Sequence, residues 1–131
     1  MAIKLNPDSA NAYSNLGSAL LNKGRTSEAI SHYKMAIKLN PDYAKAYNNL
    51  GVALFSIKKT EEAISHYKMA IKIKPDFANA HNSLGAVLFN AKMTEEAIDY
   101  FKETIRIRPG FAAAQENLET ALRSMEIQDL F

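Results

Sequence analysis

The spacing of the prolines limits what this chain can fold into more than any other feature of its sequence. The first proline is Pro7 and the last is Pro109, and all four follow one another at intervals of 34 residues. The segment EAISHYKMAIK, residues 28–38, recurs unchanged at residues 62–72. A fixed period of this length is typical of repeat architectures, in which each supersecondary unit buries its apolar face against the next. We therefore expect an array of repeats over the 131 residues.

Two helical patterns fill each period. In the first, an aromatic or His residue is followed by Leu-Gly and a second Leu; in the second, small, aromatic and aliphatic residues recur. Their spacings of three and four place these residues on one face of a helix. The first pattern occupies residues 13–20, 47–54 and 81–88, and the second occupies residues 29–37, 63–71 and 97–105. We expect short polar turns between the patterns and an almost wholly helical chain of seven helices.

Hydroxyl and charged residues mark the ends of the second helices. Thr26, Thr60 and Thr94 precede the second patterns. We expect them to be N-caps, because a hydroxyl oxygen can accept a hydrogen bond from a free N–H of the first turn. Acidic residues follow them, and Lys38 and Lys72 fall near the C-terminal ends, which agrees with the helix dipole.

A glycine recurs inside each first helix, at Gly17, Gly51 and Gly85. Glycine in a helix interior costs about 1 kcal/mol relative to Ala, so its recurrence needs a physical reason. A small residue also recurs on the second helix, beginning with Ala29. We expect the two helices of each period to approach closely at the glycine, which has no Cβ to separate them.

The residues that carry these patterns resemble the tetratricopeptide-repeat family, whose 34-residue motif joins an aromatic, Leu-Gly, a large residue, Ala, an aromatic, Ala and Pro. Three full repeats match the motif, over residues 10–43, 44–77 and 78–111. Tyr13, Tyr47 and His81 replace the favoured Trp, and Thr104 replaces the last Ala. The resemblance implies an all-α solenoid of antiparallel helical hairpins in a right-handed superhelix, with the first helices lining its concave side.

The two ends differ from the complete repeats. Residues 1–10 nearly copy residues 35–44, so we interpret residues 1–9 as a partial second helix of a preceding repeat. Residues 112–131 begin a fourth first helix, but Glu119 stands where each repeat has its glycine. Because a carboxylate there prevents the close approach of a second helix, we interpret residues 112–131 as a capping helix and tail.

Composition narrows the function. Lys and Arg number 16 against 14 Asp and Glu, too even a balance for a nucleic-acid partner. The absence of Cys excludes thiolate metal sites. No apolar run approaches the ~18 residues of a membrane span, and the N-terminus has no signal-peptide pattern. Without a nucleophile elbow, phosphate loop or acid pair, we expect a cytoplasmic protein that is not an enzyme and has no cofactor, metal, nucleic acid or membrane partner.

The concave face is the expected site for a protein or peptide partner. It is rich in Asn, a poor helix former, whose amide can pair with both the N–H and the C=O of an extended backbone. The alternatives are that these amides are only solvated and that the two Phe residues belong to the core between repeats. The expected peptide-binding residues are Asn11, Asn15, Ser18, Asn22, Lys45, Asn48, Asn49, Val52, Phe55, Asn79, Asn82, Ser83, Ala86 and Phe89.

Two known modes of recognition can be compared with this face. Asn15 and Asn49 resemble the asparagine ladder in the repeat domain of O-linked N-acetylglucosamine transferase, although Ser83 holds the third rung. The carboxylate clamp of chaperone-binding members of the family fits poorly, because only Asn49 matches the Lys, Arg and Asn positions that it needs. We therefore do not expect binding to the acidic C-terminal tails of heat-shock chaperones.

Three functions follow from these observations. The first is an interaction scaffold that captures an extended or helical peptide. The alternatives are a substrate-recruiting module of a larger, glycosyltransferase-like enzyme and a self-assembling structural protein. The first full repeat, with Leu16 and Leu20, lacks a complete neighbour on one side. We expect this uncapped N-terminal edge to support a homodimer or higher stacking.

Overall fold

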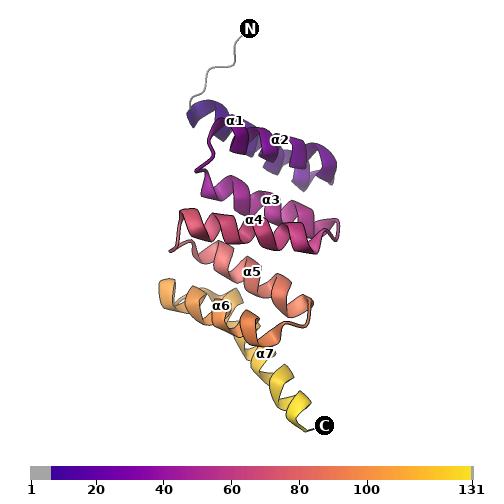
Figure 1. Ribbon diagram of the computed structural model, residues 1–131, viewed down its shortest axis with the longest axis vertical. Coiled ribbons are helices and arrows are strands. Elements are labelled where there is room, and N and C mark those ends of the chain that lie inside the picture. The colour runs from indigo at the N-terminus through magenta and orange to yellow at the C-terminus, as the bar shows by residue number, and fades with distance from the viewer. Residues whose placement is uncertain (1–6, 131) are drawn as a thin grey trace. The chain divides into compact units, whose positions relative to one another are not determined.

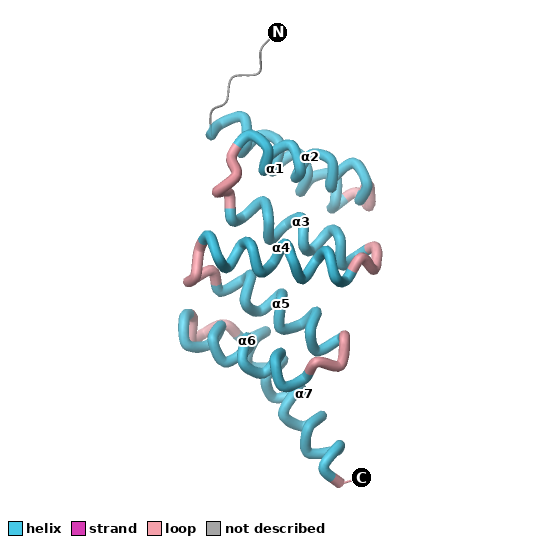
Figure 2. Tube along the Cα trace, in the orientation of Figure 1, coloured by secondary structure: helices cyan, strands magenta, loops and turns pink. Residues whose placement is uncertain are grey.

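The computed structural model describes residues 7–130. Over that range the chain forms α-helices and no strand, which confirms the predicted all-α fold and the predicted seven helices (Figure 1). Short loops join them, as Figure 2 shows. The helices are α1 (Pro7–Asn22), α2 (Thr26–Leu39), α3 (Ala44–Ser56), α4 (Thr60–Ile73), α5 (Ala78–Asn90), α6 (Thr94–Ile107) and α7 (Ala112–Asp129).

The chain divides into two compact units between Lys74 and Pro75. Unit 1 contains α1 to α4, in which α1 packs on α2, α2 on α3 and α3 on α4. Unit 2 contains α5 to α7, in which α5 packs on α6 and α6 on α7. Each unit is therefore built from hairpins of consecutive helices, as the sequence predicted. The identical segments 28–38 and 62–72 lie within α2 and α4, both in unit 1.

The glycines of the first helices face buried aromatic rings. A Cβ built on Gly51 would lie 2.7 Å from Cε1 of Tyr67, and one built on Gly85 would lie 2.6 Å from Cε1 of Phe101. The first hairpin repeats the contact at Gly17. Real Cβ atoms essentially never come this close to another heavy atom. The predicted close approach is therefore present in every hairpin, and the ring of the second helix fills the space that the missing Cβ leaves.

The turns inside the hairpins share one geometry. Gly24, Lys58 and Lys92 adopt positive φ angles of 78°, 64° and 65°. In the first turn, the Gly24 N–H donates to the Leu21 carbonyl at 3.0 Å and the Arg25 N–H donates to the Leu20 carbonyl at 2.9 Å. This pair of bonds is the Schellman motif, which ends a helix with a left-handed residue. Two of the three left-handed positions therefore carry Lys, where the motif favours Gly.

The predicted threonine N-caps are wrong by one residue. The helices begin at the threonines, and Arg25, Lys59 and Met93 hold the N-cap positions without a side-chain capping bond. The Arg25 carbonyl accepts the first intrahelical bond, from the Ala29 N–H at 3.0 Å, and that role defines the N-cap. Because the Schellman motif sets the backbone up to Arg25, the helix starts directly after it.

The ends of the described chain depart from the inner repeats. α1 begins at Pro7, a residue that is favoured at the first helical position. The predicted partial helix over residues 1–9 lies mostly outside the described residues, and its last three residues belong to α1. At the other end, α7 packs on α6 and buries Ala114 and Ala121 completely. Glu119 of α7 is exposed and pairs with Arg123 at 2.6 Å.

Candidate peptide-binding faces

The predicted peptide-binding residues of the first helices differ in how far they are exposed. Exposed members are Asn11, Asn15, Asn22, Lys45, Val52 and Asn79. Half-buried members are Ser18, Asn49, Phe55, Asn82, Ser83, Ala86 and Phe89. Asn48 departs from the expectation, because it is only 8% exposed and its Oδ1 has no hydrogen-bond partner in the described chain. Ser14, one period earlier, is buried in the same way. This position of the repeat therefore points inward in the first two repeats, whereas Asn82, its equivalent in the third, is half-buried.

Two polar side chains of unit 1 already serve the fold. The Tyr43 hydroxyl donates a hydrogen bond to Oδ1 of Asn11, which ties α1 to the start of α3. The Ser18 hydroxyl shares a 2.9 Å hydrogen bond with the hydroxyl of the buried Tyr33. Burial raises the pKa of Tyr33, and the bond to Ser18 lowers it in part. Asn15, Asn22 and Asn49 make no side-chain hydrogen bond within residues 7–130, so their amides are open to a ligand.

Unit 2 contains an amide pair that the sequence analysis missed. Nδ2 of Asn117 on α7 donates to Oδ1 of Asn82 on α5 at 3.1 Å. Asn117 stands one period after Ser83 and therefore continues the series of Asn15 and Asn49 into the capping helix. Carrying the 34-residue spacing past the third repeat would have found it. Ser83 interrupts the series of amides in the third repeat. Asn117, the next member of the series, restores an amide and is bonded to Asn82.

A cavity of about 380 Å³ lies in unit 2 on the same two helices. Phe89 of α5 forms one side of it, and the remaining lining comes from one stretch of α7. These residues of α7 are Thr120, Arg123, Ser124, Ile127 and Gln128. None of them was predicted to bind a ligand.

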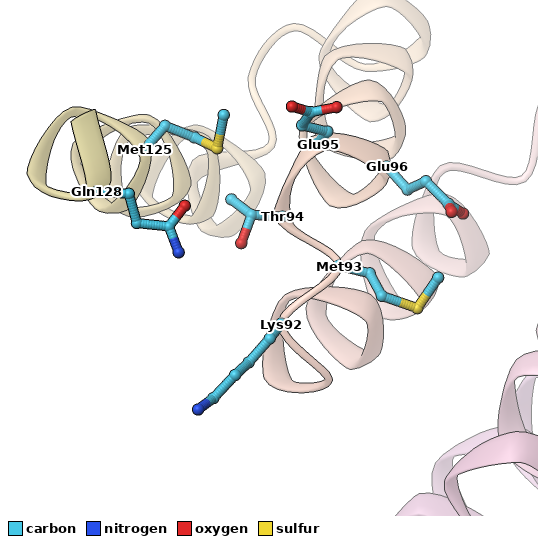
Figure 3. A pocket seen from close by; sticks show the side chains of 7 residues that line it. All are labelled: Lys92, Met93, Thr94, Glu95, Glu96, Met125 and Gln128. Carbon is cyan, nitrogen blue, oxygen red and sulfur yellow. The ribbon is translucent and has the colours of Figure 1, made fainter. Parts of the chain in front are cut away.

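A second cavity, of about 350 Å³, lies between the α5–α6 turn and α7 (Figure 3). Met125 and Gln128 of α7 face Thr94 at the start of α6, while the Glu96 side chain points away. Its acidic residues occupy the first turn of α6, where the helix dipole favours them. This cavity is therefore a gap between the last part of α7 and the first turn of α6, and we assign it no ligand.

A pair of rings joins the two helices of every hairpin. The ring centroids of Tyr47 and His66 lie 6.1 Å apart, and those of His81 and Tyr100 lie 5.9 Å apart. In the third repeat the two residue types have therefore exchanged helices. His81 is buried, its Nε2–H donates to the Pro75 carbonyl at 2.8 Å, and its Nδ1 has no partner in the described chain. Burial, with the charges of Glu96 and Asp99, raises the pKa of Tyr100.

Two further kinds of site were searched for among the described residues. No three His, Asp or Glu side chains in that part of the chain gather closely enough to hold a metal ion. Within residues 7–130, none of the helices has the combination of length and apolarity needed to cross a membrane.

Known structures resemble this chain along nearly its whole length. The first TPR of Spaghetti (RPAP3), bound to the HSP90 peptide SRMEEVD, superposes with a TM-score of 0.90 at 22% identity, covering 95% of this chain and 99% of that one. The second TPR domain of human RPAP3, in complex with the HSP70 peptide SGPTIEEVD, gives 0.82 at 23% identity, covering 88% and 98%. The Sgt2 TPR domain from Aspergillus fumigatus gives 0.89 at 21% identity, covering 93% and 82%. These likenesses establish the fold.

Sequence comparison supplies the family. No curated protein matches the chain. The tetratricopeptide-repeat model matches residues 44–77 and 78–111. A second tetratricopeptide-repeat model matches residues 1–31, and a TPR-repeat model matches residues 18–58. With its helices, its glycine contacts and these matches in agreement, the chain belongs to the tetratricopeptide-repeat family.

Proposed function

We propose that this chain is a protein-interaction module that binds a peptide segment along its first helices. The observation that carries the proposal is that each unit offers amides to a ligand, namely Asn15 and Asn49 in unit 1 and the bonded pair Asn82 and Asn117 in unit 2. A side-chain amide offers two donors and an acceptor, so it can pair with a peptide backbone whatever that peptide's side chains are. The RPAP3 structures, in which TPR domains hold HSP90 and HSP70 peptides, support the proposal by analogy of fold.

The partner differs from those peptides in one respect. Both end in Glu-Glu-Val-Asp, and the carboxylate clamp for such tails needs cations on the first and third repeats. Here the corresponding cation positions hold Ser14, Asn79 and Ser83, and Ser14 is buried. We propose that this chain binds an internal segment of its partner instead. SRMEEVD and its C-terminal amide should then bind with the same affinity, measured by fluorescence anisotropy.

The test is a selection of random peptides displayed on phage against the whole chain. Changing Asn15→Ala and Asn49→Ala together should weaken binding of a selected peptide by about 1–3 kcal/mol, because two sets of backbone hydrogen bonds are lost. Ser27→Ala with Ser65→Ala, exposed positions on α2 and α4, is the matched control. Unchanged affinity in the Asn double variant would remove the amides from the site.

Self-association is a second candidate, favoured by the edge of α1. Leu16 is 48% exposed, whereas Leu50, its equivalent on α3, is 1% exposed. Ala12 and Ala19 are exposed beside it. α2 packs on α3 in unit 1, and a helix of a second copy could cover α1 in the same manner. Sedimentation velocity should then show dimers that Leu16→Lys abolishes; a monomer at high concentration would exclude this candidate.

A further inference from the structure

We infer that α5 and α7 form a cleft in unit 2 that takes an apolar side chain of an extended peptide, with an acidic residue beside it. This inference rests on the proposed peptide-binding function and assigns α7 a role in binding besides capping. The bond between Asn82 and Asn117 lies toward one end of the two helices, and the 380 Å³ cavity between Phe89 and Ile127 lies toward the other.

The length of α7 is the first observation that supports the cleft. α7 has 18 residues, whereas α5 has 13 and ends at Asn90. Ser124 stands one period after Asn90, so the last part of α7 continues as helix where α5 has already turned. That added stretch supplies Ile127 and Gln128 to the cavity. Two of the residues that line the cavity therefore come from the stretch by which α7 is longer than α5.

Spacing along the helices fits an extended chain. Asn117, Thr120, Ser124 and Ile127 lie on one face of α7, because they follow one another at three and four residues. At a rise of 1.5 Å per residue, Ile127 lies about 15 Å along the axis from Asn117. An extended peptide advances about 3.3 Å per residue. A backbone held at the amide pair would therefore place a side chain in the cavity about four residues away.

The lining of the cavity selects the side chain. Phe89 is half-buried and Ile127 is 57% exposed, so both offer apolar surface to an incoming group. Ligand sites are mostly apolar concavities of about 300–1,000 Å³ with a few polar groups, and this cavity adds only the hydroxyls of Thr120 and Ser124 and the amide of Gln128 to its one charged group. Leu, Ile, Met or Phe of a partner peptide would be buried between Phe89 and Ile127.

The charge at the cavity selects the neighbouring residue. Among the described residues that line the cavity, Arg123 alone is charged. One of its N–H groups donates to Glu119 at 2.6 Å, but the pair is exposed and such pairs are weak. A guanidinium has five N–H donors, so further donors are available to a carboxylate, which it can bind through two parallel bonds. An acidic residue beside the apolar one therefore complements this cavity, and a basic one does not.

The experiment uses the peptides selected by phage display, whose C-termini are fused to the coat protein and carry no free carboxylate. We expect enriched sequences to place Leu, Ile, Met or Phe next to Asp or Glu. With the most enriched peptide, Arg123→Gln and Ile127→Ala should each weaken binding about tenfold. Arg123→Gln should also remove the preference for the acidic peptide over its Asn or Gln analogue, which a merely structural role would not do.

Matched controls exist on the same unit. Arg106→Gln changes an exposed, paired Arg of α6, and Leu122→Ala changes an exposed apolar residue of α7 outside the cavity lining. Neither should alter binding. A selected peptide that responds to the Asn15 and Asn49 change but not to the α7 variants would overturn this inference and leave the proposed function standing. Failure to select any peptide would overturn both.

The Ile127 methyl group provides an independent readout by NMR. Its signal should shift on titration with the selected peptide, and the fitted dissociation constant should equal the one measured by anisotropy. If the signal instead moves with protein concentration alone, together with dimers in sedimentation, the cavity is occupied by a second copy of the chain, and the peptide assignment is wrong.

Discussion

The hairpins α3–α4 and α5–α6 have the same backbone pattern but distribute their side chains differently. In the first, Tyr47 on the first helix meets His66 on the second; in the other, His81 meets Tyr100 at almost the same distance. The ring that faces the glycine is Tyr67 in the first hairpin and Phe101 in the second. The repeat therefore specifies contacts between positions, and either residue of a pair can stand on either helix.

The comparison also separates what each unit does with polar groups. In unit 1 the Tyr33 hydroxyl is held by Ser18 inside the hairpin. In unit 2 the equivalent ring, Phe101, has no hydroxyl, while the amides of α5 and α7 are joined across two helices. In unit 1 the bond between Ser18 and Tyr33 thus lies within one repeat. In unit 2 the bond between Asn117 and Asn82 lies at the face that we propose for ligand binding.

The largest expected effect comes from filling the glycine contact. Gly85→Ala should destabilise unit 2 by about 1–2 kcal/mol, because overpacking costs about 1–3 kcal/mol and the better helix propensity of Ala returns up to about 1. Gly17→Ala should cost at least as much, since the Tyr33 ring opposite it is anchored by Ser18. Urea unfolding followed by circular dichroism measures both.

Two variants control that measurement. Gly110→Ala should be nearly neutral, because a Cβ there meets nothing within 4 Å. Combining Gly85→Ala with Phe101→Leu should restore part of the lost stability if the clash with the ring is the cause. A Gly85→Ala protein as stable as the parent would show that the ring moves freely.

The exchanged rings allow a direct test of whether the positions are equivalent. His81→Tyr alone should cost about 1 kcal/mol, since it removes the bond to the Pro75 carbonyl and sets two Tyr rings against each other. Adding Tyr100→His recreates the arrangement of the second repeat and should recover the part of that cost that comes from the two Tyr rings, but not the part that comes from the lost bond to Pro75. A double-mutant cycle gives the coupling energy; additive costs would mean that the two positions are independent.

The left-handed turn residues predict a gain in stability. Lys92→Gly should stabilise unit 2 by about 0.5–1 kcal/mol, because a left-handed conformation costs a side chain with Cβ about 1–2 kcal/mol and the flexibility of Gly in the unfolded chain offsets part of this. Lys92→Ala retains the Cβ and is the control, with no gain expected. The reverse change, Gly24→Lys in unit 1, should lose a similar amount in thermal unfolding.

The smallest expected effect is a titration. Below pH about 10 the Tyr33 hydroxyl keeps its proton in both folded and unfolded chains, so pH does not act through it. Because its folded pKa is raised, the unfolded state loses the proton first as pH increases, and stability falls. Tyr33→Phe should remove about one sixth of the tyrosinate absorbance at 295 nm, all from the late part of the curve, since the chain has six Tyr. Removal from the early part would contradict the assignment.

The fold could be predicted from the sequence because the same helix, turn and glycine patterns occur three times, once in each 34-residue period. The threonine caps failed by one residue, since the Schellman motif depends on backbone φ angles at Gly24 and Lys58 that a residue pattern does not reveal. Asn48 was assigned to the ligand face because its position is one residue from that of Asn49, and only packing shows which of two neighbours turns inward.

The site was harder to predict than the fold. Asn117 was visible in the sequence at the correct interval, but the capping helix had been set apart from the repeats. Ile127 could not be found by the period at all, because its equivalent in the third repeat is Met93, at the N-cap of α6. The added length of α7 supplies Ile127 and Gln128 to that cavity, and the 34-residue period does not predict where the last helix ends.

The identity of α2 and α4 over residues 28–38 and 62–72 has a consequence for folding. Over those residues, α1 meets the same side chains whether it pairs with α2 or with α4. What distinguishes the two choices is the chain between them, residues 23–25 for the native hairpin and residues 23–59 for the wrong one. Closing the longer loop costs about 2 kcal/mol more. The correct pairing in unit 1 is therefore selected by proximity along the chain, and lengthening the first turn would allow the two partners to compete.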